Sequence, residues 1–149
     1  MRLSLFTDYS LRVLMFAALK EGVAFSLSDV AAAYGISRHH LVKVVNQLAK
    51  LGYLGTKRGR NGGIGLGMKA DDIRIGMVVR RTENSTSVVE CFDPKTNTCP
   101  LNGVCRLKGV LGEAALAFYN TLDRYTLADL VAGPDHQRMQ ELLLTPSAA

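Results

Sequence analysis

The sequence lacks any apolar stretch long enough to cross a membrane. A membrane-spanning helix needs ~18 or more consecutive uncharged residues. The apolar stretch at the N-terminus is interrupted by Arg2, Asp8 and Arg12, and these charges also argue against an export signal. We therefore expect a cytoplasmic protein that does not contact a membrane.

The sequence also lacks the motifs of common enzymes. It has no Gly-Lys-Ser/Thr of a nucleotide-binding loop, no Ser-His-Asp constellation and no substrate-pocket signature. Charged residues make up 21% and hydrophobic residues 48% of the chain, which excludes an intrinsically disordered or collagen-like protein. We expect a folded, non-enzymatic chain of one domain with an appendage.

Positive charge is concentrated in the first half of the chain. Residues 1–81 carry 13 Lys and Arg against 5 Asp and Glu, whereas residues 82–149 carry 5 against 8. A basic head on a neutral-to-acidic body is typical of a protein that binds a polyanion, and nucleic acid is the first candidate. Since a merely solvated basic surface is the alternative, the head must also show a recognisable geometry.

The spacing of apolar residues predicts a helix-turn-helix in this head. A first helix is expected from Thr7, its N-cap, to Gly22. A short helix follows from a capping box at Ser26 and stops at Gly35. Ser37 then caps a helix over 38–51, whose apolar face is Leu41, Val44, Val45, Leu48 and Leu51, and whose polar face is Arg38, His39, Lys43, Gln47 and Lys50. Such a helix can enter the major groove, although an ordinary helical hairpin is the alternative.

A hairpin after these helices predicts a β-wing. Residues 53–58 alternate like a strand, residues 59–63 have turn chemistry, and residues 64–66 return. A phosphate-cradling loop is disfavoured because this loop joins strand to strand. A last helix, opened by Asp71 or Asp72, is expected to point Ile73, Met77 and Val78 inward and Arg74, Arg80 and Arg81 outward.

Residues 1–82 are therefore interpreted as a mainly α-helical, winged helix-turn-helix DNA-binding domain for double-stranded DNA. The arginines of the wing tip could enter a minor groove. The candidate DNA-binding residues are Arg12, Ser26, Ser37, Arg38, His39, His40, Lys43, Gln47, Lys57, Arg58, Arg60 and Asn61.

All three cysteines, Cys91, Cys99 and Cys105, lie in the turn-rich segment 83–105. An odd number of thiols in a reducing cytosol disfavours disulfides. Their crowding in a polar loop favours metal ligation, and the absence of a C-x2-C pair favours an iron-sulfur cluster over a Cys3His zinc site. The fourth ligand stays open between a nearby side chain, water and a residue of a partner, since His39, His40 and His136 lie in other segments.

Residues 106–132 are predicted to form a dimerisation helix and a short terminal turn. The helix is marked by Leu107, Val110, Leu111, Ala114, Phe118 and Leu122, and the turn is capped by Thr126 and Asp129. Burial of the apolar stripe against a twin predicts a C2 homodimer. Packing back onto the head of the same chain is the alternative, and we expect both in part. The tail over 133–149 shows no interpretable pattern.

Three segments resemble the bacterial iron-sulfur winged-helix repressors: residues 6–12, the wing over 58–64, and residues 99–107. The likeness covers nearly the whole chain and is strongest to the nitric-oxide-sensing members, including the segment 125–131. Members that regulate cluster biogenesis place a histidine ligand just after the third cysteine. This chain has Arg106, Leu107 and Lys108 there.

The resemblance implies a homodimeric repressor that binds a palindromic operator while its cluster is intact. It implies a 4Fe-4S cluster, with 2Fe-2S as the alternative, held by Cys91, Cys99, Cys105 and Asp8 of the partner subunit. It further implies that nitric oxide nitrosylates the cluster and that DNA is then released. A regulator that responds to cluster status or redox stress, and a zinc-binding structural module, are the other interpretations.

Overall fold

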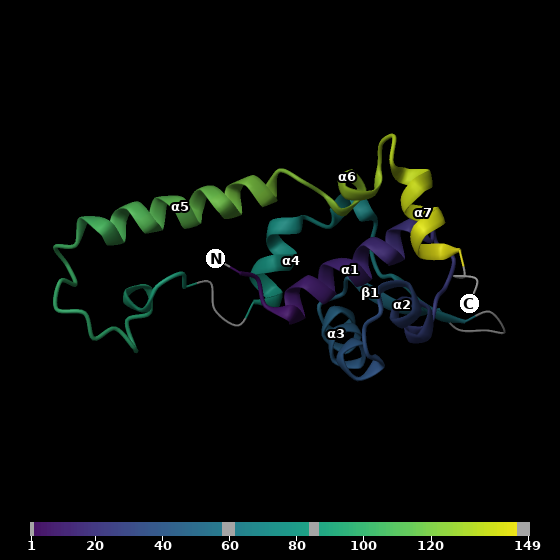
Figure 1. Ribbon diagram of the computed structural model, residues 1–149, viewed down its shortest axis with the longest axis horizontal. Coiled ribbons are helices and arrows are strands. Elements are labelled where there is room, and N and C mark those ends of the chain that lie inside the picture. Colours follow the sequence, from purple (N-terminus) through teal and green to yellow (C-terminus); the bar gives the residue numbers. More distant parts are fainter. Residues whose placement is uncertain (1, 58–61, 84–86, 146–149) are drawn as a thin grey trace.

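The structure is a computed structural model that describes residues 2–57, 62–83 and 87–145. A winged-helix head gathers most of the elements, and one long helix, α5, extends from it as an arm (Figure 1). This arrangement confirms the mainly α-helical fold with a small β-wing. The elements are α1 (Leu5–Leu19), α2 (Leu27–Tyr34), α3 (Arg38–Lys50), β1 (Leu54–Lys57), β2 (Gly63–Leu66), the 3-10 turn η1 (Ala70–Asp72), α4 (Ile75–Thr82), the 3-10 turn η2 (Glu90–Phe92), α5 (Arg106–Asp123), α6 (Leu127–Val131) and α7 (His136–Leu144).

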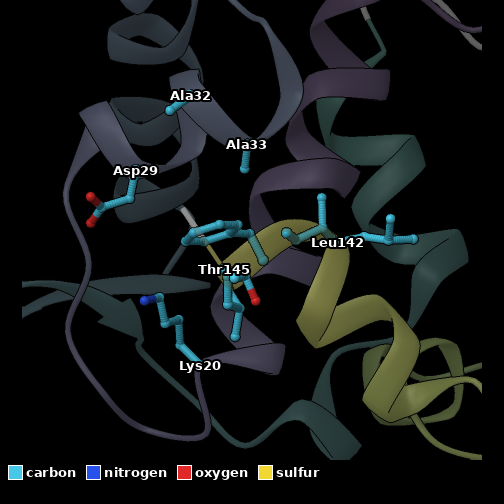
Figure 2. Close-up of a pocket in the computed structure, with 9 residues that line it drawn as sticks. Lys20, Asp29, Ala32, Ala33, Leu142 and Thr145 are labelled. Atoms are coloured by element: carbon cyan, nitrogen blue, oxygen red, sulfur yellow. The ribbon is translucent and has the colours of Figure 1, made fainter. Parts of the chain in front are cut away.

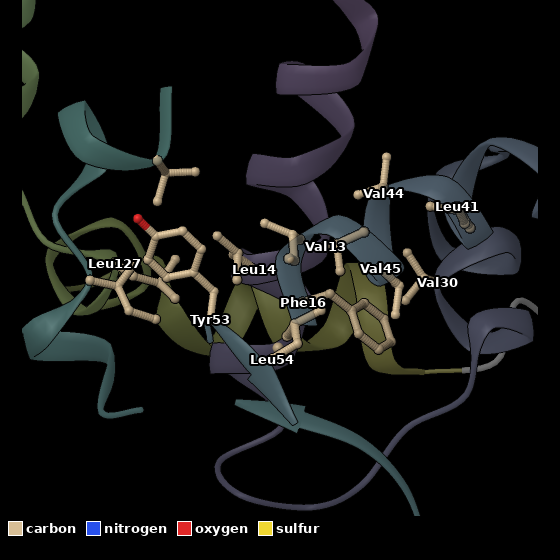
Figure 3. Packing of buried hydrophobic residues seen from close by; sticks show 14 of the residues in the cluster. Val13, Leu14, Phe16, Val30, Leu41, Val44, Val45, Tyr53, Leu54 and Leu127 are labelled. Atoms are coloured by element: carbon tan, nitrogen blue, oxygen red, sulfur yellow. The ribbon is translucent and has the colours of Figure 1, made fainter. Parts of the chain in front are cut away.

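Helix α1 is the centre of the head. Its Val13, Leu14 and Phe16 are almost completely buried, and they belong to a cluster with residues of α2, α3, β1, α4 and α6 (Figure 3). Because α1 is surrounded on more than one side, its buried residues cover more of its circumference than a single stripe: they are Thr7, Ser10, Val13, Leu14, Phe16, Ala17 and Leu19. No helix in the described part of the chain is long and apolar enough to span a membrane.

The start of α1 differs from the prediction. The N-cap is Ser4, whose Oγ accepts a hydrogen bond from the backbone N–H of Thr7 at 3.2 Å. Thr7, the predicted cap, lies fully buried in the first turn. Both residues are good caps by type, and the tertiary burial of Thr7 decides between them.

The turn between α2 and α3 follows the sequence prediction. Ser26 and Asp29 form a reciprocal capping box, and α2 ends at Gly35 in the left-handed conformation, with φ of +63°. Ile36 is buried beneath the turn, and Ser37 occupies the N-cap position of α3. The predicted apolar face of α3 is buried, except for Leu51, which is half-buried just beyond the helix.

The wing is a two-stranded antiparallel hairpin, as predicted. Leu54 of β1 pairs with Leu66 of β2, and Lys57 pairs with Gly63. A further bridge joins Phe25 to Ile64, with backbone hydrogen bonds of 2.9 and 2.8 Å. The hairpin is therefore fixed to the segment that precedes α2.

Helix α4 begins later than predicted, and its faces are predicted only in part. Ile73 and Val78 are fully buried, and Arg74 and Arg81 are exposed, as predicted. The acidic pair forms η1, and α4 itself starts at Ile75. Its buried face is Ile75, Val78, Val79 and Thr82, an i, i+3, i+4, i+7 set. Met77, predicted to point inward, lies off this stripe and is 43% exposed. Arg80, predicted to point outward, contacts α5 instead.

The C-terminal segment contains a helix that the sequence analysis did not predict. Helix α7 packs on α1 and α2, at the opposite side of the head from α5 (Figure 1). His136 contacts Glu21 at 3.1 Å, and the Gln140 side chain donates a hydrogen bond to the Leu19 carbonyl at 3.1 Å. The preceding turn, α6, is capped by Thr126 and Asp129 as predicted.

Replacement of Gly35 tests how the helix-turn-helix is held. An added Cβ at Gly35 meets no heavy atom within 4 Å, so only the positive φ penalises a side chain. We expect Gly35→Ala to lower the free energy of unfolding by about 1 kcal/mol, measured by urea denaturation. Gly35→Asn is the matched control and should lose less, since asparagine tolerates this conformation. Equal stability of the alanine variant and the wild type would contradict the assignment.

Candidate nucleic-acid interface and metal centre

One side of α3 carries the predicted DNA-reading side chains. Arg38, His39, His40 and Lys43 are exposed, and Gln47 is half-buried. The opposite side of the helix is anchored in the core by its buried apolar residues. His40 also lies against Tyr9 of α1, with ring centroids 6.0 Å apart. The core therefore fixes the direction in which this polar face points.

Two further residues share this exposed face and escaped the sequence analysis. Val42 is 42% exposed, and Asn46 is exposed one turn later. The spacing of four from Arg38 through Val42 to Asn46 could have identified both residues. A search for polar side chains alone overlooks an exposed valine, although thymine presents a methyl group in the major groove.

The two predicted serine contacts lie in different environments. Ser26 is engaged in its capping box, where its N–H donates to the Asp29 carboxylate at 2.7 Å and its Oγ accepts from the Asp29 N–H at 3.3 Å. Ser37 is exposed and makes no side-chain capping bond to α3. The hydroxyl of Ser37 and the first amides of α3 thus form an anion-favouring helix start.

Arg12 and Asp8 form an ion pair on the surface of α1. Arg12 Nη2 lies 2.9 Å from Asp8 Oδ2, and its guanidinium lies 5.7 Å from the ring centroid of Tyr34. Burial raises the pKa of Tyr34. Both charged side chains are about two-fifths exposed, so they remain accessible to another chain or to DNA.

The wing carries one of the predicted DNA contacts within the described residues. Lys57 is the last residue of β1. The predicted contacts Arg58, Arg60 and Asn61 lie outside the described residues.

The three cysteines lie along the loop that leads into α5. Cys91 is in η2, Cys99 follows in the loop, and Cys105 is the N-cap of α5. All three thiols are free and half-buried. The loop is braced by Glu90, whose Oε1 accepts hydrogen bonds from the N–H and hydroxyl of Thr98 at 2.7 and 2.8 Å. These bonds hold the pKa of Glu90 below its ordinary value.

An open hollow of about 480 Å³ adjoins the third thiol. It is lined by Phe92, Asn102, Gly103, Cys105, Lys108, Gly109 and Gly112. Three free thiols, one of them beside this glycine-lined hollow, fit a thiolate-ligated iron-sulfur cluster in their chemistry. Among the described residues, however, no three His, Cys, Asp or Glu side chains are gathered closely enough to hold a metal ion. A single chain therefore supplies the thiol donors without closing the site.

The other predicted ligand lies apart from the thiols of its own chain. Asp8 is in the first turn of α1, whereas the cysteine loop lies at the far end of the α5 arm (Figure 1). His39 and His40 are on α3, and His136 is on α7. Within the described part of the chain, none of these residues completes a metal-binding group with the cysteines.

The arm leaves an apolar face uncovered. None of the residues of α5 is completely buried, and Leu107 and Val110 of the predicted apolar stripe are each more than half exposed. The arm contacts α4 of the head. Packing on its own head therefore accounts for only part of the predicted burial.

Another hollow, of about 320 Å³, lies between α1, α2 and the last turn of α7 (Figure 2). Its lining includes Phe16, Lys20 and Asp29 together with alanines and leucines. The Asp29 carboxylate is already used in the capping box. With no cysteine or histidine in its lining, this hollow is separate from the candidate metal centre.

Comparison with known proteins gives one family match and close relatives. Residues 3–133 match the family described as "Rrf2: Iron-dependent Transcriptional regulator". The chain is 53% identical over 132 residues to the HTH-type transcriptional regulator NsrR of Bacillus subtilis strain 168, covering 88% of this chain and 90% of that protein. It is 51% identical over 144 residues to NsrR of Geobacillus kaustophilus, covering 96% and 97%.

Solved structures share the fold at lower identity. CymR, the global cysteine regulator of B. subtilis, superimposes with a TM-score of 0.71 at 28% identity and covers 87% of this chain and 95% of its own. IscR of T. potens gives a TM-score of 0.70 at 25% identity, with 88% and 86% covered.

Proposed function

Because the chain belongs to the Rrf2 family of transcriptional regulators, we propose that it is a homodimeric repressor that releases operator DNA in response to nitric oxide. The family match confirms the resemblance inferred from the sequence. The relatives are regulators, as expected for a chain without enzyme motifs. The observation that carries the proposal is the set of three unpaired cysteines at the far end of an arm attached to a winged helix-turn-helix.

Helix α3 would lie in the major groove of the operator. Lys43 and Gln47 would contact base edges, and the exposed Val42 would meet a thymine methyl. Ser37 and the first amides of α3 would bind a phosphate, while the basic wing follows the adjacent minor groove. The buried side of α3 supports this assignment because it fixes the helix in the head.

Cys91, Cys99 and Cys105 would hold an iron-sulfur cluster, with Asp8 of the partner subunit as the fourth ligand and 4Fe-4S as the preferred type. When bound, the cluster supplies iron sites that nitric oxide nitrosylates. The separation of Asp8 from the thiols within one chain supports ligation in trans. A carboxylate oxygen is a weaker partner for this iron than a thiolate, so this bond is the expected point of entry.

The dimer would form by burial of the uncovered face of α5 against its twin. Leu107 and Val110 would then leave water. In such a dimer, the ligand bond between Asp8 and the partner subunit's cluster would fix the two heads relative to each other. Their α3 helices must meet half-sites that lie one or more helical turns, roughly 34 to 36 Å each, apart.

The central experiment uses protein purified without oxygen and a duplex selected in vitro by the wild-type protein. We expect iron, acid-labile sulfide and tight binding in the wild type, with binding lost after stoichiometric nitric oxide. Cys91→Ala, Cys99→Ala and Cys105→Ala should each remove the visible absorption and weaken duplex binding at least about tenfold. Thr96→Ala, in the same loop, is the matched control. Zinc in place of iron and sulfide would instead support the structural zinc module.

Mixed dimers test whether Asp8 acts across the subunit boundary. One chain carries Asp8→Ala and the other carries Cys99→Ala. Ligation in trans leaves one complete ligand set in this dimer, so half of the wild-type cluster spectrum should persist. Ligation within one chain leaves no complete ligand set in this dimer, so no wild-type cluster spectrum is expected. The absence of any wild-type signal, with both homodimeric variants folded, would remove Asp8 of the partner subunit from the proposed set.

Base reading by α3 is tested with a library of duplexes at one salt concentration. We expect Lys43→Ala and Gln47→Ala to relax the preference at one or two base positions, each by ~1–3 kcal/mol. Lys50→Ala, at the end of α3, is the matched control and should weaken all duplexes alike. A uniform loss from Gln47→Ala across the library would contradict its base-reading role.

A further inference from the structure

The α5 arm meets the head at a small joint on α4. The residues of the joint are Gly76 and Arg80 of α4 with Tyr119 and Asp123 of α5. Each pair is spaced by four residues, so each lies on one face of its helix. Figure 1 shows the two helices side by side at this end of the arm and diverging from there to the cysteine loop.

The joint is held by a two-point contact. Arg80 Nη1 and Nη2 donate to Asp123 Oδ1 and Oδ2, both at 2.7 Å. The guanidinium also lies 4.6 Å from the ring centroid of Tyr119. The hydrogen bond from Arg80 holds the pKa of Asp123 below its ordinary value, and the same bond raises the pKa of Arg80. The guanidinium pairs two of its nitrogens with one carboxylate and also stacks on an aromatic ring, so it fixes the angle between the two helices as well as the distance between them.

Gly76 leaves the room that this contact needs. A Cβ built on Gly76 would meet the Asp123 carboxylate at Oδ1 and at Cγ, with Cγ only 2.8 Å away. Arg80 Nη1 lies 3.0 Å from the same Cβ, so both partners of the contact would have to shift from their present positions. Glycine within a helix is otherwise unfavourable, so close approach explains its presence at this position.

The position of the joint allows it to do more than hold α5 against the head. Cys105 is the N-cap of α5 and Asp123 is its last residue, so a single helix links the thiol loop to the joint. The helix has 18 residues, which makes it about 27 Å long, and a tilt of about 10° at the joint moves its far end by about 5 Å. Beyond the joint, backbone bonds from Ile75 to Tyr125 and from Leu127 to Ile73 return the chain to the core.

We propose that Arg80 and Asp123, with Gly76 beneath them, are positioning residues that set the angle of the α5 arm on the winged-helix head and so relay the state of the cysteine loop to the two α3 helices. This inference rests on the proposed function, since it assigns a route by which that function reaches DNA. The side chains of Arg80 and Asp123 are 33% and 39% exposed. Their contact differs from an ordinary surface ion pair in being bidentate and stacked on Tyr119.

The test compares Arg80→Ala, Asp123→Asn and Gly76→Ala with the wild type. Arg124→Ala, which removes a cation next to the joint, is the matched control. Affinity for the selected duplex is measured by fluorescence anisotropy with metal-loaded and metal-free protein, and the ratio of the two affinities reports the relay. We expect the three joint variants to lower this ratio at least about fivefold while keeping the wild-type visible spectrum. The control should keep the ratio.

Gly76→Ala is the sharpest of these variants. This variant keeps the charges of Arg80 and Asp123, and alanine favours a helix more than glycine does. If the contact only stabilised the fold, the ratio of metal-loaded to metal-free affinity would therefore stay at its wild-type value. Displacement of the carboxylate predicts the same loss as Arg80→Ala. Wild-type ratios in all three variants would overturn the proposal and leave the proposed function standing.

A second measurement does not depend on the metal. Non-natural residues that carry a ketone replace Glu113 of α5 and Lys50 of α3, and a spin label is attached to each. The distance between the two labels reports the angle of the arm in metal-free protein, in which labelled chains are diluted with unlabelled chains. The distance distribution should be narrow in the wild type and broad in Arg80→Ala and Gly76→Ala. An equal width in all of them would overturn the proposal. If wild-type protein bound the duplex equally well with and without metal, the proposed function would be overturned, and the relay with it. The distance distribution would still decide whether the joint sets the angle of the arm.

Discussion

The burial of α1 is the constraint on which the rest of the head depends. Val13, Leu14 and Phe16 lie in one apolar cluster that also includes side chains from α2, α3, α4 and α6. The recognition helix, the wing and the last helix therefore share one support. The arm is different, because its contact with the head is to α4 alone among the larger helix contacts. The chain thus combines a head built around one shared core with a cysteine-bearing arm that packs on it at one end.

Features that depend on local chemistry could be predicted from the sequence. The capping boxes of Ser26 and Thr126, and the left-handed Gly35, follow from side chains within four residues of each other. The two faces of α3 follow from helical periodicity. Features that depend on tertiary contacts could not be predicted. Ser4 and Thr7 are equally good caps until burial is known, and the exposure of Met77 depends on where α4 begins.

Helix α7 and the candidate metal centre show the same limit at larger scale. A nine-residue helix has little stability alone, so α7 depends on its contacts with α1 and α2. The sequence identifies the thiols because their type and spacing are visible in one segment. It cannot show whether they converge, and the single chain leaves them apart among the described residues. Closure of such a site is a property of an assembly rather than of a segment.

The uncovered arm also has a consequence for the amount of protein in a cell. Most of the stability of a helix in a protein comes from packing of its apolar face, and α5 completely buries none of its own residues. If a twin supplies the missing cover, the folded fraction of the arm rises with protein concentration. Newly made or surplus chains would then expose a frayed segment to proteases before they find a mate. Abundance would in this way be limited by turnover of solitary chains.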